Sequence, residues 1–188
     1  AVMVPQPNAE AQSAARRVRG LKAVAQLRIS NCWLRLGASG VAAVVASSLV
    51  GTAWPLIWYL GLIPIVLIDR VLYVRLLKHC ETKAPPRTIR GLWAWTAFQS
   101  AYGNILAVML WFAPYVPGET LAVMYLCGGL ANGATSLRGV PSLALCGMGP
   151  GIATMLALPV AEFVTGGGVN TLELAPLVGG LVLVGFGV

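Results

Sequence analysis

Long apolar runs, separated by short polar or proline-containing segments, follow one another along most of this chain. Each run approaches the ~20 apolar residues that an α-helix needs to cross the hydrocarbon of a bilayer. The runs lie at residues 36–52, 55–73, 91–112, 120–137 and 142–160, and a sixth begins near residue 171. This pattern predicts an all-α fold, a polytopic transmembrane helical bundle of about six spans.

The residues ahead of the first run have a different pattern. From residue 9 to residue 36, apolar side chains recur at steps of three and four, and six cations lie among the other positions. This is typical of an amphipathic interfacial helix, where each cation gains about 1 kcal/mol from anionic lipid. A helix that docks on a partner protein has the same pattern, so both interpretations stay open. The residues assigned to the membrane surface are Arg16, Arg17, Arg19, Lys22 and Arg28.

The cations are distributed unevenly among the segments between the runs. Residues 69–90 contain six of the thirteen Lys and Arg residues. A charge at the bilayer centre costs about 2.5–3.5 kcal/mol, so we expect an aqueous loop here, and the positive-inside bias places it in the cytoplasm. Asp69 and Arg70, at the inner end of the second run, are expected to pair or to snorkel. The remaining cations fall on the same side and Glu119 and Glu162 on the other, which places both termini in the cytoplasm.

Composition excludes an ordinary soluble domain. Hydrophobic residues make up 57% of the chain and charged residues 10%, and the mean hydropathy is +0.78, whereas soluble domains carry about 25% charged residues. The net charge of +7 would also suit a nucleic-acid partner. Because the membrane topology already accounts for this charge, we expect the lipid bilayer as partner, with anionic lipid at the cytoplasmic face, and no nucleic acid.

No constellation of residues points to catalysis, a metal or a cofactor. The four cysteines, Cys32, Cys80, Cys127 and Cys146, lack metal-ligand or redox spacing. His79 is the only histidine, and neither a second histidine nor clustered carboxylates complete a site with it. We therefore expect no enzyme within these residues, and no catalytic residue, metal or cofactor.

Three of the predicted spans carry small and polar residues where apolar ones are the rule. Small residues let membrane helices approach closely, and an amide in hydrocarbon seeks a partner on another helix, so these residues predict a packing seam. They also fit a small-molecule pocket, in which Pro150 frees a backbone carbonyl and the amides of Gln99, Asn104 and Asn132 face inward. The residues of this candidate pocket or seam are Gln99, Ser100, Gly103, Asn104, Gly129, Asn132, Gly133, Gly147, Pro150 and Gly151.

The layout of short-looped spans behind a basic helix resembles a known kind of membrane domain. It is similar to the membrane-embedded N-terminal region of bacterial sensor histidine kinases and membrane-anchored diguanylate cyclases. The proline-bearing segment SLRGVPSLALCGMGPGIA at residues 136–153 belongs to this resemblance. The resemblance implies a sensory or anchoring domain in the bacterial inner membrane, with an output domain outside these residues.

Two other functions remain open. The chain is also consistent with a non-catalytic accessory subunit of a larger energy-transducing or photosynthetic membrane complex, and less well with a small transporter, since no inverted repeat with matched broken helices is found. We expect a homo-oligomer or a larger membrane complex. The domains are residues 1–35, a tail and basic amphipathic helix, and residues 36–188, six spans. Because the chain stops at Val188 inside an apolar run, we expect it to be part of a longer protein, and a soluble extension would favour the sensor.

Overall fold

The structure, a computed structural model, describes residues 9–79, 86–114 and 117–164. Within these ranges it contains helices and no strands, so the prediction of an all-α bundle is confirmed. The helices are α1 (Ala9–Ser30), α2 (Cys32–Val50), α3 (Trp54–His79), α4 (Pro86–Trp111), α5 (Pro117–Leu137) and α6 (Pro141–Val164).

Two of these helices, α2 and α6, are long and apolar enough to cross a membrane. By itself this is weak evidence for a membrane, because a core helix of a soluble protein has the same length and composition. The number of spans therefore stays a prediction. The sixth predicted span lies outside the described residues.

The first two helices are joined end to end. Only Asn31 separates them, and its backbone continues the helical hydrogen bonding, from its N–H to Leu27 O and from Arg35 N–H to its own carbonyl. Helix α2 therefore begins before residue 36, where the first span was predicted to start. It ends at Gly51, which has φ +68° and donates its N–H to Ser47 O. That left-handed conformation is why a glycine follows the helix.

The basic segment at residues 69–90 is not the loop that its charge predicted. Helix α3 continues to His79 and α4 already begins at Pro86, so most of the segment is helical. The reason is that it is amphipathic: Arg70, Arg75 and Lys78 are exposed, whereas Tyr73 and Leu76 are buried against neighbouring helices.

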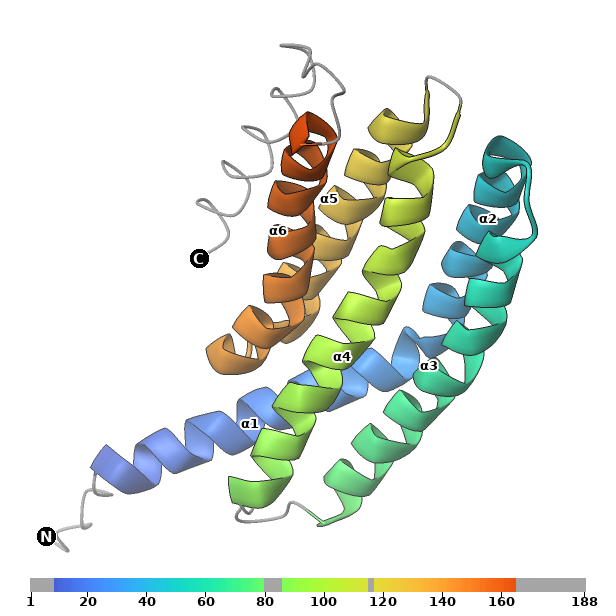
Figure 1. Ribbon diagram of the computed structural model, residues 1–188. Coiled ribbons are helices and arrows are strands. Elements are labelled where there is room, and N and C mark those ends of the chain that lie inside the picture. Colours follow the sequence, from blue (N-terminus) through green and yellow to red (C-terminus); the bar gives the residue numbers. More distant parts are fainter. Residues whose placement is uncertain (1–8, 80–85, 115–116, 165–188) are drawn as a thin grey trace, which may run out of the picture.

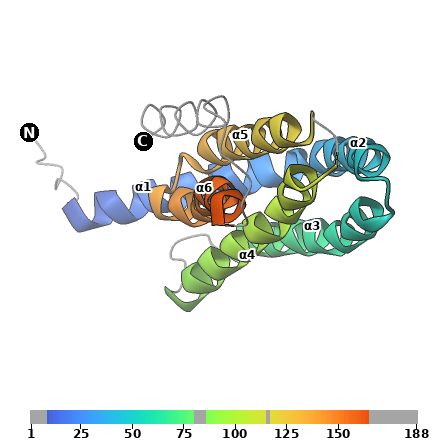
Figure 2. The ribbon, with the colours of Figure 1, turned by 45° about the horizontal axis from the view of Figure 1, so that its top comes forward.

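Helix α4 is the centre of the bundle. It packs most extensively against α6 and α5, and it also contacts α2 and α3. In the view of Figure 2, α4 lies between the α2–α3 pair and the α5–α6 pair. Successive helices from α2 to α6 run in opposite directions, so the α2–α3 turn and the end of α6 lie at one end of the bundle (Figure 1). Helix α1, the end of α3 and the α5–α6 turn lie at the other end.

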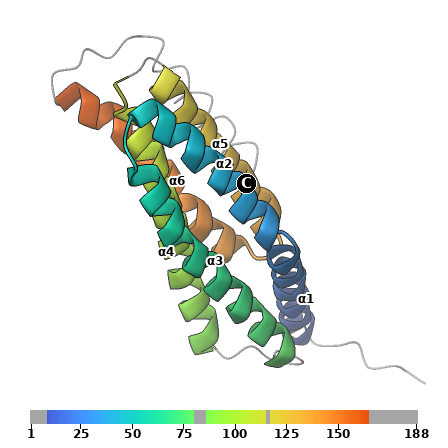
Figure 3. The same ribbon diagram turned by 90° about the vertical axis from the view of Figure 1, so that its right-hand side faces the viewer.

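Helix α1 crosses that second end of the bundle, below α2 (Figures 1 and 3). Its apolar side chains Leu21, Val24 and Ala25 are buried in a cluster with Tyr73 and Leu137, among others. The chain's own bundle thus covers this part of the apolar face, and whether α1 also lies at the membrane surface stays a prediction. Three of the basic residues assigned to the membrane surface, Arg16, Arg19 and Lys22, are exposed, and the side chain of Arg17 lies outside the described part.

A pair of glycines lets the backbone of α1 contact the backbone of the α5–α6 turn directly. A Cβ atom added at Gly20 would collide with the carbonyl oxygen of Gly139, and one added at Gly139 would lie 3.0 Å from the carbonyl oxygen of Gly20. Since backbone atoms cannot rotate away as side chains do, α1 can dock here only with glycine at residue 20, and a larger residue at 139 would fit tightly. Neither residue was singled out from the sequence.

Candidate functional site: a polar pocket above a buried ion cluster

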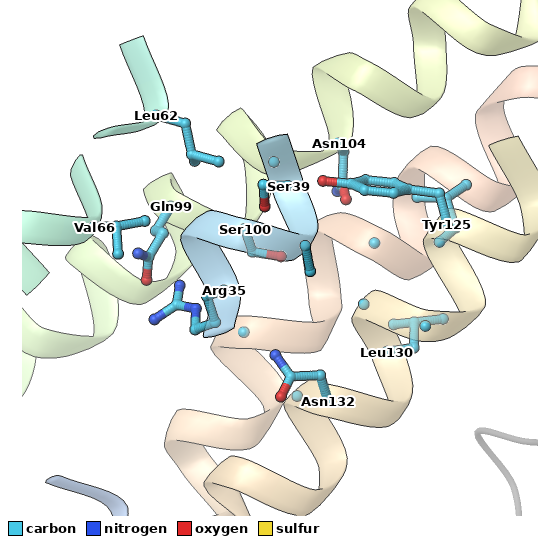
Figure 4. A pocket seen from close by; sticks show the side chains of 18 of the residues that line it. Arg35, Ser39, Leu62, Val66, Gln99, Ser100, Asn104, Tyr125, Leu130 and Asn132 are labelled. Atoms are coloured by element: carbon cyan, nitrogen blue, oxygen red, sulfur yellow. The ribbon is translucent and has the colours of Figure 1, made fainter. Parts of the chain in front are cut away.

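A pocket of about 450 Å³ lies among α2, α4, α5 and α6, with α3 and the end of α1 contributing to its wall. Figure 4 shows Arg35 and Ser39 from α2 facing Gln99, Ser100 and Asn104 from α4. Apolar side chains on α3 and α5 and glycines on α5 and α6 make up most of the remaining lining. The pocket thus combines a polar wall with apolar ones, as small-molecule sites commonly do.

Most of the small and polar residues that the sequence singled out line this pocket. The exception is Pro150, which lies inside α6 but not in the pocket wall. The lining residues among the ten are Gln99, Ser100, Gly103, Asn104, Gly129, Asn132, Gly133, Gly147 and Gly151.

The three amides line the pocket at different depths. Gln99 is buried, Asn104 is half-buried and Asn132 is exposed. Asn132 Oδ1 accepts a hydrogen bond from Ser136 on its own helix (3.0 Å). Asn104 donates to Thr154 Oγ1 on α6 (3.3 Å), the kind of interhelical bond that a packing seam predicts.

Several of the same residues bring α4, α5 and α6 into close contact. A Cβ atom at Gly133 would lie 3.2 Å from Met148 Cγ, and one at Gly151 would lie 3.0 Å from Leu130 Cδ2. One at Gly147 would lie 2.6 Å from Leu137 Cδ1. These glycines therefore act in close packing and also line the pocket. Whether the pocket binds a molecule stays a prediction.

Beside the pocket, Asp69 is the centre of a buried ion cluster. Its residue is 1% exposed, and its Oδ2 accepts hydrogen bonds from Arg28 Nη1 (3.2 Å) and Arg35 Nη1 (3.0 Å). Its other oxygen, Oδ1, accepts from Trp95 Nε1 (3.0 Å). Arg28 Nη1 also donates to Gln99 Oε1 (2.8 Å). The cluster therefore ties α1, α2, α3 and α4 together at one point.

The partners of Asp69 correct two expectations. Arg28 was assigned to the membrane surface, but it turns into the bundle, where its side chain is 10% exposed. Asp69 was expected to pair with Arg70 or to snorkel, yet Arg70 is exposed and its guanidinium lies over the Trp33 ring. The reason is helical geometry: adjacent residues point about 100° apart, so a buried Asp69 directs Arg70 elsewhere.

The cluster is unbalanced in charge and in hydrogen bonds. Two guanidinium groups face one carboxylate, which leaves a net charge of +1. Arg28 Nε and Gln99 Nε2 are buried and make no hydrogen bond. Both are donors. Arg28 also lies over the Tyr73 ring, 5.8 Å from its centroid, which offsets part of the cost of burying the cation.

The described residues do not suggest a metal centre. No three of their His, Cys, Asp or Glu side chains lie close enough together to hold an ion. Cys32, Cys127 and Cys146 are free thiols. Cys80 and the side chain of His79 lie outside the described part of the chain.

Comparison with known proteins identifies no relative. No protein-family model, no curated protein and no solved structure matches this chain. The fold and the pocket therefore define the class of protein only as an α-helical bundle with a polar internal site.

Proposed function

We propose that this chain is a sensory domain in the inner membrane of a bacterium, and that the polar pocket is its input site. The observation that carries the proposal is the contact between pocket and ion cluster: Arg28, Arg35 and Gln99 belong to both. A molecule in the pocket would therefore touch the residues that hold α1 to the bundle. The output domain would lie on a part of the protein outside these residues.

The proposal includes six spans with both termini in the cytoplasm. It is supported by the position of the charges. Arg90, Lys78 and Arg138 belong to the end of the bundle at which α1 lies, whereas Glu119 and Glu162 belong to helix ends at the opposite end. The positive-inside bias would place the basic end in the cytoplasm.

The topology is tested by labelling single cysteines in a cysteine-free background. Lys78→Cys and Thr52→Cys place thiols at exposed positions at opposite ends of α3. In right-side-out vesicles, a membrane-impermeant maleimide should label position 52 and should reach position 78 only after the membrane is permeabilised. Labelling of both from the same side would contradict the proposed topology.

The ion cluster gives the pocket a way to change the position of α1. Arg28 on α1 bonds to Asp69 on α3 and to Gln99 on α4. A negatively charged ligand group beside Arg35 and Gln99 would compete with Asp69 for the two guanidinium groups, and would so favour an arrangement of α1 different from the one in this structure. A ligand shifts such an equilibrium only by its difference in affinity for the two arrangements.

The function is tested in the full native protein in membranes, by assaying kinase or cyclase output. Gln99→Leu should change the basal output and abolish its response to the stimulus. The matched control is Ala101→Leu, which places the same side chain on the exposed face of α4, outside the pocket wall. Equal output from both variants and the native protein would contradict the sensory function. Stable co-purification with a membrane complex that has no signalling output would instead favour the accessory subunit.

A further inference from the structure

Two residues that line the pocket carry buried donors without acceptors. Arg28 donates to Gln99 Oε1, which orients the Gln99 amide and directs its NH₂ group away from Arg28. Gln99 is only 5% exposed, lines the pocket, and has no hydrogen-bond partner for Nε2. Arg28 Nε is buried and unpartnered as well. An unmade hydrogen bond in a buried donor costs the full desolvation of the group, so the missing partner is an acceptor.

The charge of the same residues specifies the acceptor further. Arg28 and Arg35 share one carboxylate, that of Asp69, so the net charge of the three side chains is +1. The described carboxylates of Glu119 and Glu162 lie at the opposite end of the bundle. A group with a single negative charge would neutralise the cluster, and a guanidinium binds such oxyanions through two parallel N–H donors.

The other walls of the pocket suit an apolar chain. Leu62 and Val66 on α3 and Leu130 on α5 line it. Leu34 on α2 and Met124 on α5 also line it and are 70% and 65% exposed. Large apolar side chains at the rim are suited to a ligand that enters from lipid, and they would be poorly placed in an entrance for a free inorganic ion.

We infer that the pocket binds an amphiphile with a single negative charge, an oxyanion head group at Arg35 and Gln99 and an apolar chain against α3 and α5. Two sources share this chemistry: the carboxylate of a fatty acid and the phosphodiester of an anionic phospholipid. The role of this ligand as a stimulus rests on the proposed sensory function, whereas its binding does not.

The test measures thermal unfolding of the purified chain in a neutral detergent with four probes. Decanoate supplies charge and chain, and dihexanoyl-phosphatidylglycerol supplies the phosphodiester. Decanol supplies the chain alone and butyrate the charge with a very short chain. At least one of the first two probes should raise the unfolding temperature in a saturable way, and which of them does so identifies the source. Decanol and butyrate should act only at much higher concentrations.

Variants locate the binding. Arg35→Gln and Gln99→Leu should weaken binding of the active probe about tenfold to a hundredfold, because each removes a hydrogen bond from a charged ligand. Arg35→Gln leaves Asp69 bonded to Arg28 and Trp95, and Gln99→Leu keeps both cations. The matched control is Arg70→Gln, which removes an exposed cation outside the pocket wall and should leave binding unchanged. If Arg35→Gln fails to fold, the binding measured with Gln99→Leu still tests whether the probe lies in the pocket.

Three results would overturn the inference. Equal binding of decanol and decanoate would show that the site recognises only the apolar chain. No stabilisation by decanoate or by dihexanoyl-phosphatidylglycerol would mean that water satisfies the donors. Unchanged binding in both pocket variants would place the ligand elsewhere. Failure of the sensory function would give a different result. The probe would then bind selectively, but the output of the full protein would not change with Gln99→Leu.

Discussion

The two regions that meet at α4 are held together by different physical means. The ion cluster joins α1, α2 and α3 to α4 through hydrogen bonds to Asp69 and Gln99. The seam joins α4, α5 and α6 through close packing at small residues such as Gly133 and Gly147. One end of the same pocket is therefore sensitive to charge and the other to volume. Substitutions that keep the size of a side chain but change its charge should affect only the ion cluster. Substitutions that change the size without changing the charge should affect only the seam.

The largest effect is expected at Asp69. Asp69→Asn keeps the shape of the side chain but leaves Arg28 and Arg35 as two partly buried cations without a counter-charge. Removing one partner of a buried ion pair costs about 3–5 kcal/mol. The free energy of unfolding in neutral detergent micelles measures this loss. Arg70→Gln is the control and should cost less than about 1 kcal/mol, because this cation is exposed. Equal effects of the two substitutions would mean that the cluster contributes no stability.

An intermediate effect is expected from added volume in the seam. Gly133→Leu should destabilise the bundle by about 1–3 kcal/mol through overpacking against Met148. Gly129→Leu is a matched control, because a Cβ there would meet nothing within 4 Å. Both substitutions gain the same helix propensity, so their difference in unfolding free energy reports packing alone. If Gly129→Leu is as destabilising as Gly133→Leu, close packing is not what the seam requires.

The smallest effect is expected from the hydrogen bond in the seam. Thr154→Val keeps the volume and removes the acceptor of Asn104. Interhelical hydrogen bonds in membranes average about 0.6 kcal/mol, so a loss of this size in unfolding free energy is expected. Thr135→Val is the control, because that hydroxyl donates only to carbonyls of its own helix. If Thr154→Val lowered the unfolding free energy as much as Asp69→Asn, the ion cluster and the seam would not differ in the way proposed.

Much of the helical arrangement could be predicted from the sequence. The length and spacing of the apolar runs predicted the positions of five helices, although the predicted end of α3 lies at residue 73 rather than at His79 and the predicted start of α4 at residue 91 rather than at Pro86. The small-residue spacing at Gly133, Gly147 and Gly151 indicated that α5 and α6 pack closely against each other. These are local features, and each depends on residues within one helix.

The ion cluster could be predicted only in outline. An aspartate inside an apolar run requires a partner, and Asp69 was visible as such a residue. Its partners, however, are 34 and 41 positions away along the chain. Which cation reaches it depends on how α1, α2 and α3 cross, and the sequence pattern of one helix contains no information on that crossing. The adjacent Arg70 was the obvious candidate, and it points to the outside.

The sequence by itself determined that this chain is an apolar helical bundle with its cations gathered in a few segments, since composition and periodicity act through local burial. Three contacts could be found only in the tertiary structure: the bundle covers the apolar side chains Leu21, Val24 and Ala25 of α1, Gly20 lies against Gly139, and Arg28 and Arg35 share Asp69. Each of these contacts joins residues far apart in the chain, and its energy depends on distances that only the packed helices define.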